Sequence, residues 1–188
     1  GYLYRPVRQH SVEKLVDAAQ KMIDSTGYEE MSLSSLSTSD FTCLHELIDR
    51  LLEITVDKRI NLSLPSLRVD NFSMELMEKV QTVKKSGLTF APEAGTQRLR
   101  DVINKNVLES DLLRTSRIAF EGGYNRIKLY FMIGLPTETD EDVLGIAHLA
   151  EKVLNVFYDI PKEERKGRGV NITVSTSSFV PKPFTPFQ

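Results

Sequence analysis

Short strand-like runs alternate with amphipathic helical segments along most of this 188-residue sequence. The runs are rich in apolar and β-branched residues and occupy residues 29–37, 59–67, 87–93, 125–134 and 169–180. Helical segments, whose apolar residues recur three and four positions apart, separate these runs. This order is typical of parallel βα units with right-handed crossovers. The sequence therefore predicts an α/β fold.

Capping signals mark where several of the helices begin. The candidate N-cap residues are Ser11, Ser39 or Asp40, Ser73 and Thr139. Asp142 follows Thr139 by three positions, which predicts a well-capped start for a long helix. Gly27 is placed to end the first helix as a C-cap glycine.

Polar residues at alternate strand positions bear on the architecture. Those residues are Ser32, Ser34, Ser63, Lys128, Tyr130, Thr173 and Ser175. A doubly wound sheet and an incomplete (β/α) barrel both fit the order of elements. A parallel sheet covered on both faces would show nearly continuous apolar strands. The alternation therefore favours a partial (β/α) barrel in which one strand face lines a wet or ligand-filled space.

Composition excludes several classes of protein. Hydrophobic content of 40% and charged content of 27% indicate a globular domain, and the net charge of −2 gives no general affinity for nucleic acid. One cysteine, Cys43, rules out a disulfide framework within these residues, and we expect it to be a buried structural thiol. No apolar run is long enough to span a membrane, so the cytoplasm is the expected location.

Polar and small residues gather where the predicted strands end. In parallel βα folds, ligands bind at the carboxyl ends of the strands. The corresponding segments are residues 35–40, 65–70, 92–98, 134–139 and 175–183. They are rich in Gly, Pro, Ser and carboxylates, so the predicted binding site lies where they converge.

Two charged residues within this pattern have open interpretations. Glu93 ends an apolar strand, where its carboxylate could hold two ribose hydroxyls or simply favour the dipole of the next helix. Lys128 would share a strand face with Tyr130 and Met132. An inward lysine needs a carboxylate partner, either Glu93 or a ligand; otherwise it reaches solvent at the amino end of the strand.

Three linked motifs resemble the radical SAM superfamily. They read PEAGTQRLRDVINK, YFMIGLPTETDED and FVPKPFTPF, and the resemblance covers nearly the whole chain. It looks closest to the branch with an upstream cobalamin-binding domain. The resemblance implies a partial barrel of six parallel strands. It also implies a 4Fe–4S cluster that reduces S-adenosylmethionine and releases a 5′-deoxyadenosyl radical.

One departure from the family pattern is plain. The family's cluster-binding loop with three cysteines is absent, and residues 1–9 resemble the segment that follows it. Gly1 is not methionine and residues 183–188 stop mid-pattern, so we expect an excised piece that supplies strands two to six. The resemblance implies that such a piece, residues 1–188, neither holds the cluster nor catalyses by itself.

The resemblance also implies roles for residues at the first strand ends. The family's Gly-Gly-Glu contacts the methionine amino group, and the matching residues here are Ser37, Thr38, Ser39 and Asp40. Loss of the family's glutamate leaves hydroxyls or the Asp40 carboxylate for that contact. Glu93 matches the polar residue that binds the ribose hydroxyls.

Further positions match the remainder of the cofactor site. Lys105 matches a basic residue that meets the methionine carboxylate, and residues 134–136 (Gly134, Leu135 and Pro136) match the turn that packs against adenine. Phe179 and Val180 match the strand end that bonds the adenine edge. Arg68, at the end of the third strand, would lie near substrate.

The resemblance implies partners outside these residues. They are the upstream cluster-binding loop, a cobalamin-binding domain, and an electron donor such as flavodoxin or ferredoxin. A missing first strand would expose a sheet edge and allow self-association. Two alternatives remain: a barrel that binds without catalysing, and a metal-dependent lyase or hydrolase using Glu93, Glu138 and Asp40.

Overall fold

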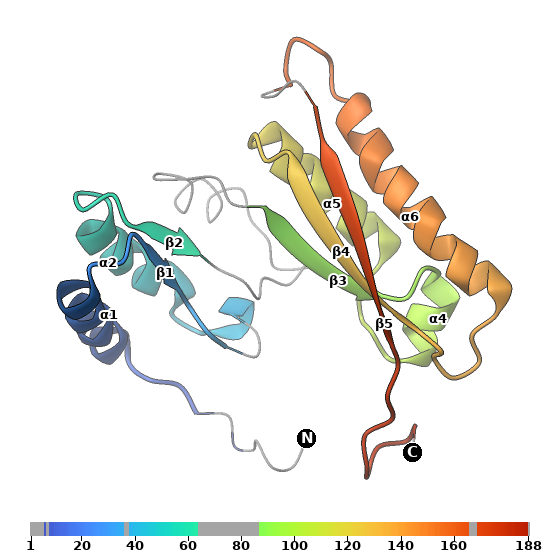
Figure 1. The fold of residues 1–188 in the computed structure, drawn as a ribbon, viewed down its shortest axis with the longest axis horizontal. Coiled ribbons are helices and arrows are strands. Elements are labelled where there is room, and N and C mark those ends of the chain that lie inside the picture. Colours follow the sequence, from blue (N-terminus) through green and yellow to red (C-terminus); the bar gives the residue numbers. More distant parts are fainter. Residues whose placement is uncertain (1–5, 7, 36–37, 64–86, 166–168, 188) are drawn as a thin grey trace. The chain divides into compact units, whose positions relative to one another are not determined.

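The computed structural model describes Pro6 and residues 8–35, 38–63, 87–165 and 169–187 (Figure 1). The chain divides into two compact units, and the described residues up to 63 and from 87 onward belong to different units. Each unit is considered by itself. The helix predicted from Ser73 and two predicted site residues, Ser37 and Arg68, lie outside the described residues.

The N-terminal unit combines two helices with a two-stranded parallel sheet. Its elements are α1 (Val12–Thr26), β1 (Glu30–Ser32), a 3-10 turn (Thr38–Asp40), α2 (Leu44–Thr55) and β2 (Asn61–Ser63). In the sheet, Met31 pairs with Leu62. These two side chains are buried in one core with residues of both helices, including Ala19 and Leu51. The core forms because each amphipathic helix buries its apolar face.

Capping in this unit agrees with the sequence at α1 and differs at α2. The Ser11 hydroxyl accepts a hydrogen bond from the Lys14 N–H, and Gly27 ends the helix with φ of 67°. The predicted cap of α2 by Ser39 or Asp40 is wrong, because Thr38–Asp40 forms a separate 3-10 turn. Cys43 occupies the N-cap position instead and is exposed, so its predicted burial is also wrong.

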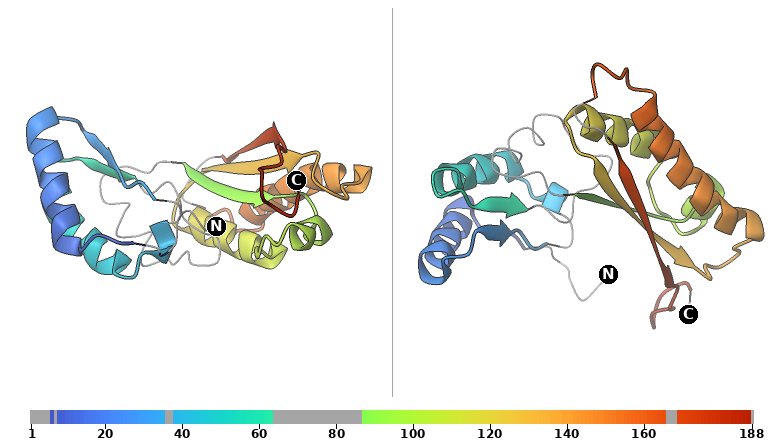
Figure 2. Two further views of the ribbon diagram at one scale, coloured as in Figure 1. Left: turned by 90° about the horizontal axis from the view of Figure 1, so that it is seen from below. Right: turned by 45° about the horizontal axis from the view of Figure 1, so that its top comes forward.

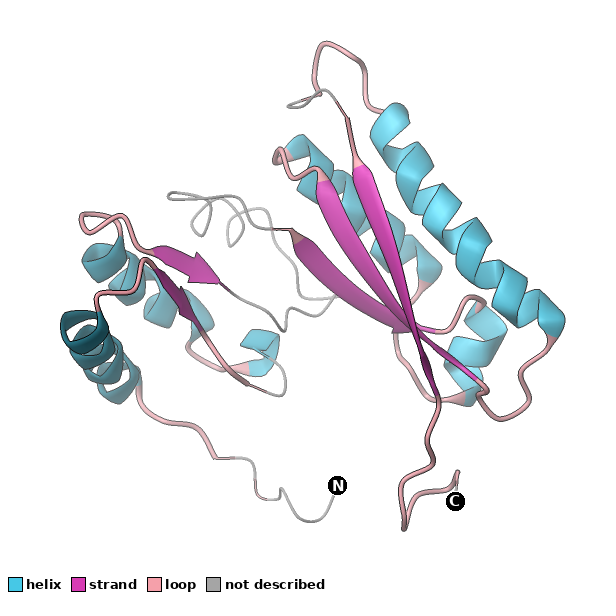
Figure 3. Ribbon diagram, viewed as in Figure 1, coloured by secondary structure: helices cyan, strands magenta, loops and turns pink. Residues whose placement is uncertain are grey.

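The C-terminal unit contains a three-stranded parallel sheet with β4 in the centre (Figure 3). Its elements are β3 (Leu88–Glu93), α4 (Gln97–Val102), α5 (Glu109–Glu121), β4 (Arg126–Ile133), α6 (Asp140–Tyr158) and β5 (Asn171–Ser178). Helices separate successive strands, as the sequence predicts. Thr96 caps α4 by accepting a hydrogen bond from the Leu99 N–H.

The two faces of this sheet differ sharply in polarity. The helices lie on one face (Figures 1 and 2), where Ile127, Leu129 and Phe131 are almost fully buried. The Phe120 ring of α5 meets the Phe157 ring of α6 edge to face at 5.4 Å. On the other face, Lys128 is in register with Thr89 and Thr173. The predicted alternation of apolar and polar strand positions is therefore present.

The described strands are all parallel, which confirms an α/β fold built from βα units. They form sheets of two and three strands, and closure into a partial barrel stays a prediction. No helix of the described ranges is long and apolar enough to cross a membrane.

The segment after α6 is partly anchored to the helix. Ile160 is almost fully buried. Arg165 donates hydrogen bonds to the carbonyl oxygens of Ile160 and Tyr158. Its guanidinium also lies 5.3 Å from the centre of the Phe157 ring. These contacts hold the chain around Ile160 and Arg165 against the end of α6.

Candidate functional site

Glu93 ends β3 in a backbone conformation that residues other than glycine rarely adopt. Its φ is 69°, and the pairing of β3 with β4 shifts register between Phe90 and Glu93. A left-handed non-glycine residue costs about 1–3 kcal/mol and persists only where its surroundings impose it. The turn after β3 is therefore a place where strain is held by neighbouring contacts.

The side chain of Glu93 forms an ion pair with Lys105. The distance from Lys105 Nζ to Glu93 Oε1 is 3.2 Å, and the side chains are 33% and 26% exposed, respectively. The pair thus stands partly open to solvent. The suggested pairing of Glu93 with Lys128 is not what the structure shows.

The buried Arg100 forms hydrogen bonds to the backbone next to Glu93 and at Lys105. Arg100 Nη1 donates to the Ala94 carbonyl oxygen at 2.9 Å, and the Arg100 carbonyl accepts from the Lys105 N–H at 2.8 Å. The residue is only 1% exposed, and this burial lowers the pKa of its guanidinium. Arg100 thereby fixes the backbone beside Glu93 and beside Lys105.

The turn after β4 brings a glycine and a buried leucine to the same end of the sheet. Gly134 has φ of 87°, which favours glycine, and its N–H donates to Glu138 Oε2 at 2.7 Å. A Cβ at Gly134 would meet nothing within 4 Å, so the space beside it is open. Leu135 is 4% exposed and packs with Ala94 and Leu99. This contact joins the turns that follow β3 and β4.

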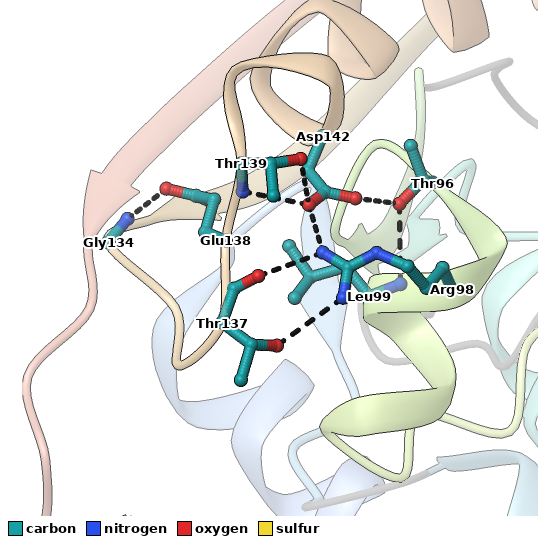
Figure 4. Close-up of polar contacts among 8 residues, drawn as sticks. All are labelled: Thr96, Arg98, Leu99, Gly134, Thr137, Glu138, Thr139 and Asp142. Carbon is teal, nitrogen blue, oxygen red and sulfur yellow. Dashed lines mark hydrogen bonds and ion pairs between the residues drawn. The ribbon is translucent and has the colours of Figure 1, made fainter.

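The Asp142 carboxylate accepts hydrogen bonds from residues of both the turn after β3 and the turn after β4 (Figure 4). It accepts hydrogen bonds from the hydroxyl of Thr96 and the guanidinium of Arg98. The N–H and hydroxyl of Thr139 also donate to Asp142 Oδ2, at 2.9 and 2.8 Å. Thr139 and Asp142 form the capping box that the sequence predicts for α6.

The charge on Asp142 is stabilised despite its burial. The residue is 2% exposed, and burial alone would raise the pKa of its carboxyl. The hydrogen bonds from Thr96, Arg98 and Thr139 outweigh that effect and hold the pKa well below its usual range. Asp142 is therefore ionised throughout the neutral range and most of the acidic range.

Arg98 extends this network to the turn before α6. Its Nη2 donates to the Thr137 carbonyl at 2.9 Å, and its Nη1 lies 3.4 Å from Thr137 Oγ1 (Figure 4). Thr137 has φ of 65°, an outlying conformation for a β-branched residue. Arg98 thus helps to hold the strained turn against the start of α4.

Two glycines allow the turn after β3 and helix α6 to approach closely. A Cβ added to Gly95 would overlap the backbone of Asp142 and Ile146. A Cβ added to Gly145 would lie 2.8 Å from Thr96 Cγ2 and 3.1 Å from the Gly95 carbonyl carbon. No Cβ fits at either position without movement of backbone or of Thr96.

Several residues assigned from the sequence meet at the carboxyl end of the three-stranded sheet. Glu93 pairs with Lys105, while Phe179 packs against the cluster that contains Leu135. The Phe179 N–H donates to the Ile133 carbonyl at 2.8 Å, so the ends of β4 and β5 are neighbours. Pro136 is half-buried in the same turn as Leu135, and Val180 is exposed.

Other assigned residues lie elsewhere. Lys128 and Tyr130 are on the polar face of β4, where the Lys128 ammonium lies 5.1 Å from the centre of the Tyr130 ring. In the N-terminal unit, Thr38 is buried, and its hydroxyl has no hydrogen-bond partner in the described chain. Ser39 and the exposed Asp40 belong to the same 3-10 turn.

Sequence reasoning missed the network around Asp142. The capping box was visible as Thr139 followed by Asp142, but Thr96 and Arg98 lie 46 and 44 positions from Asp142. No local pattern could connect them. Among the described residues, no group of three or more His, Cys, Asp or Glu side chains gathers as a metal site would require.

The chain is similar to a known protein family and to a protein from an archaeon. A family model described as the radical SAM superfamily matches residues 2–150. An uncharacterized protein of Methanocaldococcus jannaschii is 33% identical over 186 residues, which cover 99% of this chain and 38% of that protein. The chain thus spans well under half of the relative's length.

Proposed function

This chain belongs to the radical SAM superfamily, and on that premise we propose that the protein containing it cleaves S-adenosylmethionine reductively. The main evidence for this proposal is the family match over residues 2–150. A reduced 4Fe–4S cluster would supply the electron that cleaves S-adenosylmethionine, and the side chains of the protein would bind and orient that cofactor.

Glu93, at the end of β3, and its partner Lys105 fit the ribose and methionine parts of that cofactor. The part-exposed Glu93 carboxylate can accept hydrogen bonds from two ribose hydroxyls. Lys105, also part-exposed, can meet the methionine carboxylate. Arg100 would act as a positioning residue, since it fixes the backbone next to both.

The turns after β4 and β5 fit an adenine. Gly134 presents open space on a left-handed backbone, so a flat ring can approach the main chain there. Leu135 and Pro136 would support that turn from the core, and Phe179 and Val180 would border the ring. In the N-terminal unit, Ser37, Thr38, Ser39 and Asp40 remain our candidates for the methionine amino group.

The cluster does not fit the residues of this chain. Cys43 is its one cysteine and is exposed, whereas a 4Fe–4S cluster needs a set of thiolate ligands. We therefore propose that a three-cysteine loop elsewhere in the protein binds the cluster, with a flavodoxin or ferredoxin as reductant in the cytoplasm. A cobalamin-binding domain of the same protein, substrate contacts by Arg68, Lys128 and Tyr130, and self-association through the edge of β1 are further proposals.

The direct test uses the full-length protein that contains this chain, with its cluster reconstituted anaerobically. After reduction, we expect 5′-deoxyadenosine to form from S-adenosylmethionine, measured by chromatography with mass detection. An intact cluster that yields no 5′-deoxyadenosine would overturn the enzymatic proposal. It would leave the alternative of a barrel that binds without catalysing.

Replacing Glu93 with glutamine tests the ribose assignment. The Glu93→Gln variant of the reconstituted protein should bind S-adenosylmethionine about tenfold more weakly, because hydrogen bonds to charged groups contribute about 1.5–3 kcal/mol. Equilibrium binding under anaerobic conditions measures the change. Glu121→Gln, which removes an exposed carboxylate on α5, is the matched control and should bind normally. Equal affinities of the two variants would refute the assignment.

A further inference from the structure

A cleft of about 380 Å³ opens at the amino ends of the strands in the C-terminal unit. Its lining comes from the first residues of all three strands and the residue before β3. The lining residues are Gly87, Leu88, Thr89, Arg126, Ile127, Lys128, Asn171 and Thr173. The volume falls within the range of small-molecule sites in proteins.

The charge of this cleft is opposite to that of the chain. The whole sequence carries a net charge of −2, yet the described lining contains two cations, Arg126 and Lys128, and no carboxylate. The hydroxyls of Thr89 and Thr173 and the amide of Asn171 add neutral hydrogen-bonding groups. The cleft therefore offers donors and positive charge to an anion.

Neither cation is neutralised within the part of the chain that the structure describes. Several other basic residues of this unit do have acidic partners, among them Arg98 with Asp142 and Lys105 with Glu93. Within the described residues, Arg126 and Lys128 form no such ion pair, and the Lys128 ammonium lies 5.1 Å from the centre of the Tyr130 ring. Because Glu93 is paired with Lys105, it does not supply a carboxylate to Lys128, and a ligand anion can take that place.

The spacing of the two cations strengthens this interpretation. Arg126 and Lys128 are two positions apart on β4, so they share one face of the sheet. Like charges that share a face repel one another, and a bound anion would relieve that repulsion. Lys128 is half-buried, which makes its unpaired charge more costly than that of a solvated surface lysine.

We propose that this cleft binds the phosphate or carboxylate group of a ligand other than S-adenosylmethionine. Lys128 precedes Gly134 by six positions, which corresponds to about 20 Å along an extended strand. A group held by Arg126 and Lys128 is therefore remote from the Glu93 end of the sheet. The inference therefore describes a second site, separate from the candidate cofactor site, and it does not rest on the proposed function.

The test measures anion binding to the full-length protein in the absence of S-adenosylmethionine. Titration calorimetry at low ionic strength, with inorganic phosphate in one arm and malonate in the other, should show saturable binding in at least one arm. The tighter arm then identifies a phosphoryl or a carboxylate ligand. The double variant Arg126→Gln/Lys128→Met should bind the preferred anion at least tenfold more weakly, with circular dichroism confirming that it is folded.

The matched control removes two cations from the helices of the same unit. Arg117 and Lys152 each have an acidic partner, so Arg117→Gln/Lys152→Met should bind the anion with wild-type affinity. If the cleft double variant is unfolded, the single variant Arg126→Gln replaces it. We expect this variant to bind the preferred anion at least threefold more weakly than the wild type. The proposal is overturned by no saturable binding in either arm, or by equal losses in the cleft and control variants. Because neither the cluster nor S-adenosylmethionine takes part, the result does not depend on whether the cleavage proposal succeeds.

Discussion

Replacing Gly95 with alanine is expected to lower the free energy of unfolding by about 3 kcal/mol or more. The added Cβ would overlap the backbone of Asp142 and Ile146, which no side-chain rotation can relieve. Helix α6 would have to move away from the turn that carries Glu93. Chemical denaturation of wild-type and variant protein measures the loss, and a weaker affinity for S-adenosylmethionine should accompany it.

The same substitution at Gly169 provides the control. A Cβ at Gly169 meets nothing within 4 Å, and its backbone is not left-handed, so Gly169→Ala should change stability by no more than about 0.5 kcal/mol. A Gly95→Ala variant as stable as Gly169→Ala would show that α6 does not pack against the turn as the structure describes.

Substitution of Asp142 by asparagine should have the second large effect. The variant keeps the shape of the side chain but loses its negative charge. In the wild type, this charge accepts hydrogen bonds from Arg98 and from the N–H and hydroxyl of Thr139. We expect a loss on the order of 3 kcal/mol at neutral pH, because a buried and well-bonded charge is removed while Arg98 remains half exposed. Urea unfolding monitored by circular dichroism measures this loss.

The pH dependence of that loss follows from the lowered pKa of Asp142. Because the native pKa lies below the unfolded value of about 3.9, the unfolded state binds the proton first as pH falls. The contribution of Asp142 is therefore complete above about pH 5 and decreases as the solution is acidified through the native pKa. The difference in stability between wild type and Asp142→Asn should shrink over that acidic range.

Asp140 provides the comparison for this experiment. It is an exposed acid in the first turn of the same helix, so Asp140→Asn should lose only the favourable interaction with the helix dipole, about 0.5 kcal/mol. Equal losses for the Asp140 and Asp142 variants at neutral pH would contradict the role given to the buried carboxylate.

Local sequence patterns predicted much of this fold. The alternation along β4 was readable because one strand face is buried under helices and the other carries residues such as Lys128 and Tyr130. Ser11, Gly27 and Thr139 marked helix boundaries because capping depends on residues within one turn. These features are determined within short segments, so a single sequence contains them.

Features that depend on contacts between distant segments were not readable. Cys43 was expected in the core, but the apolar face of α2 turns elsewhere and leaves it exposed. The sequence placed Glu93 at a strand end but gave no sign of its left-handed backbone or of its bond to Lys105. Gly95 could be predicted as a turn residue, but the need for glycine arises from α6, which lies far along the chain.

The contact between Thr96 and Asp142 has a consequence for the order in which the C-terminal unit folds. The two residues are 46 positions apart, and the intervening chain contains α4, α5 and β4. Closing such a long loop is entropically unfavourable until the intervening elements have packed. The network around Asp142 should therefore form after the folding transition state. Substitutions there should then accelerate unfolding and leave the refolding rate nearly unchanged, which stopped-flow measurement of both rates would show.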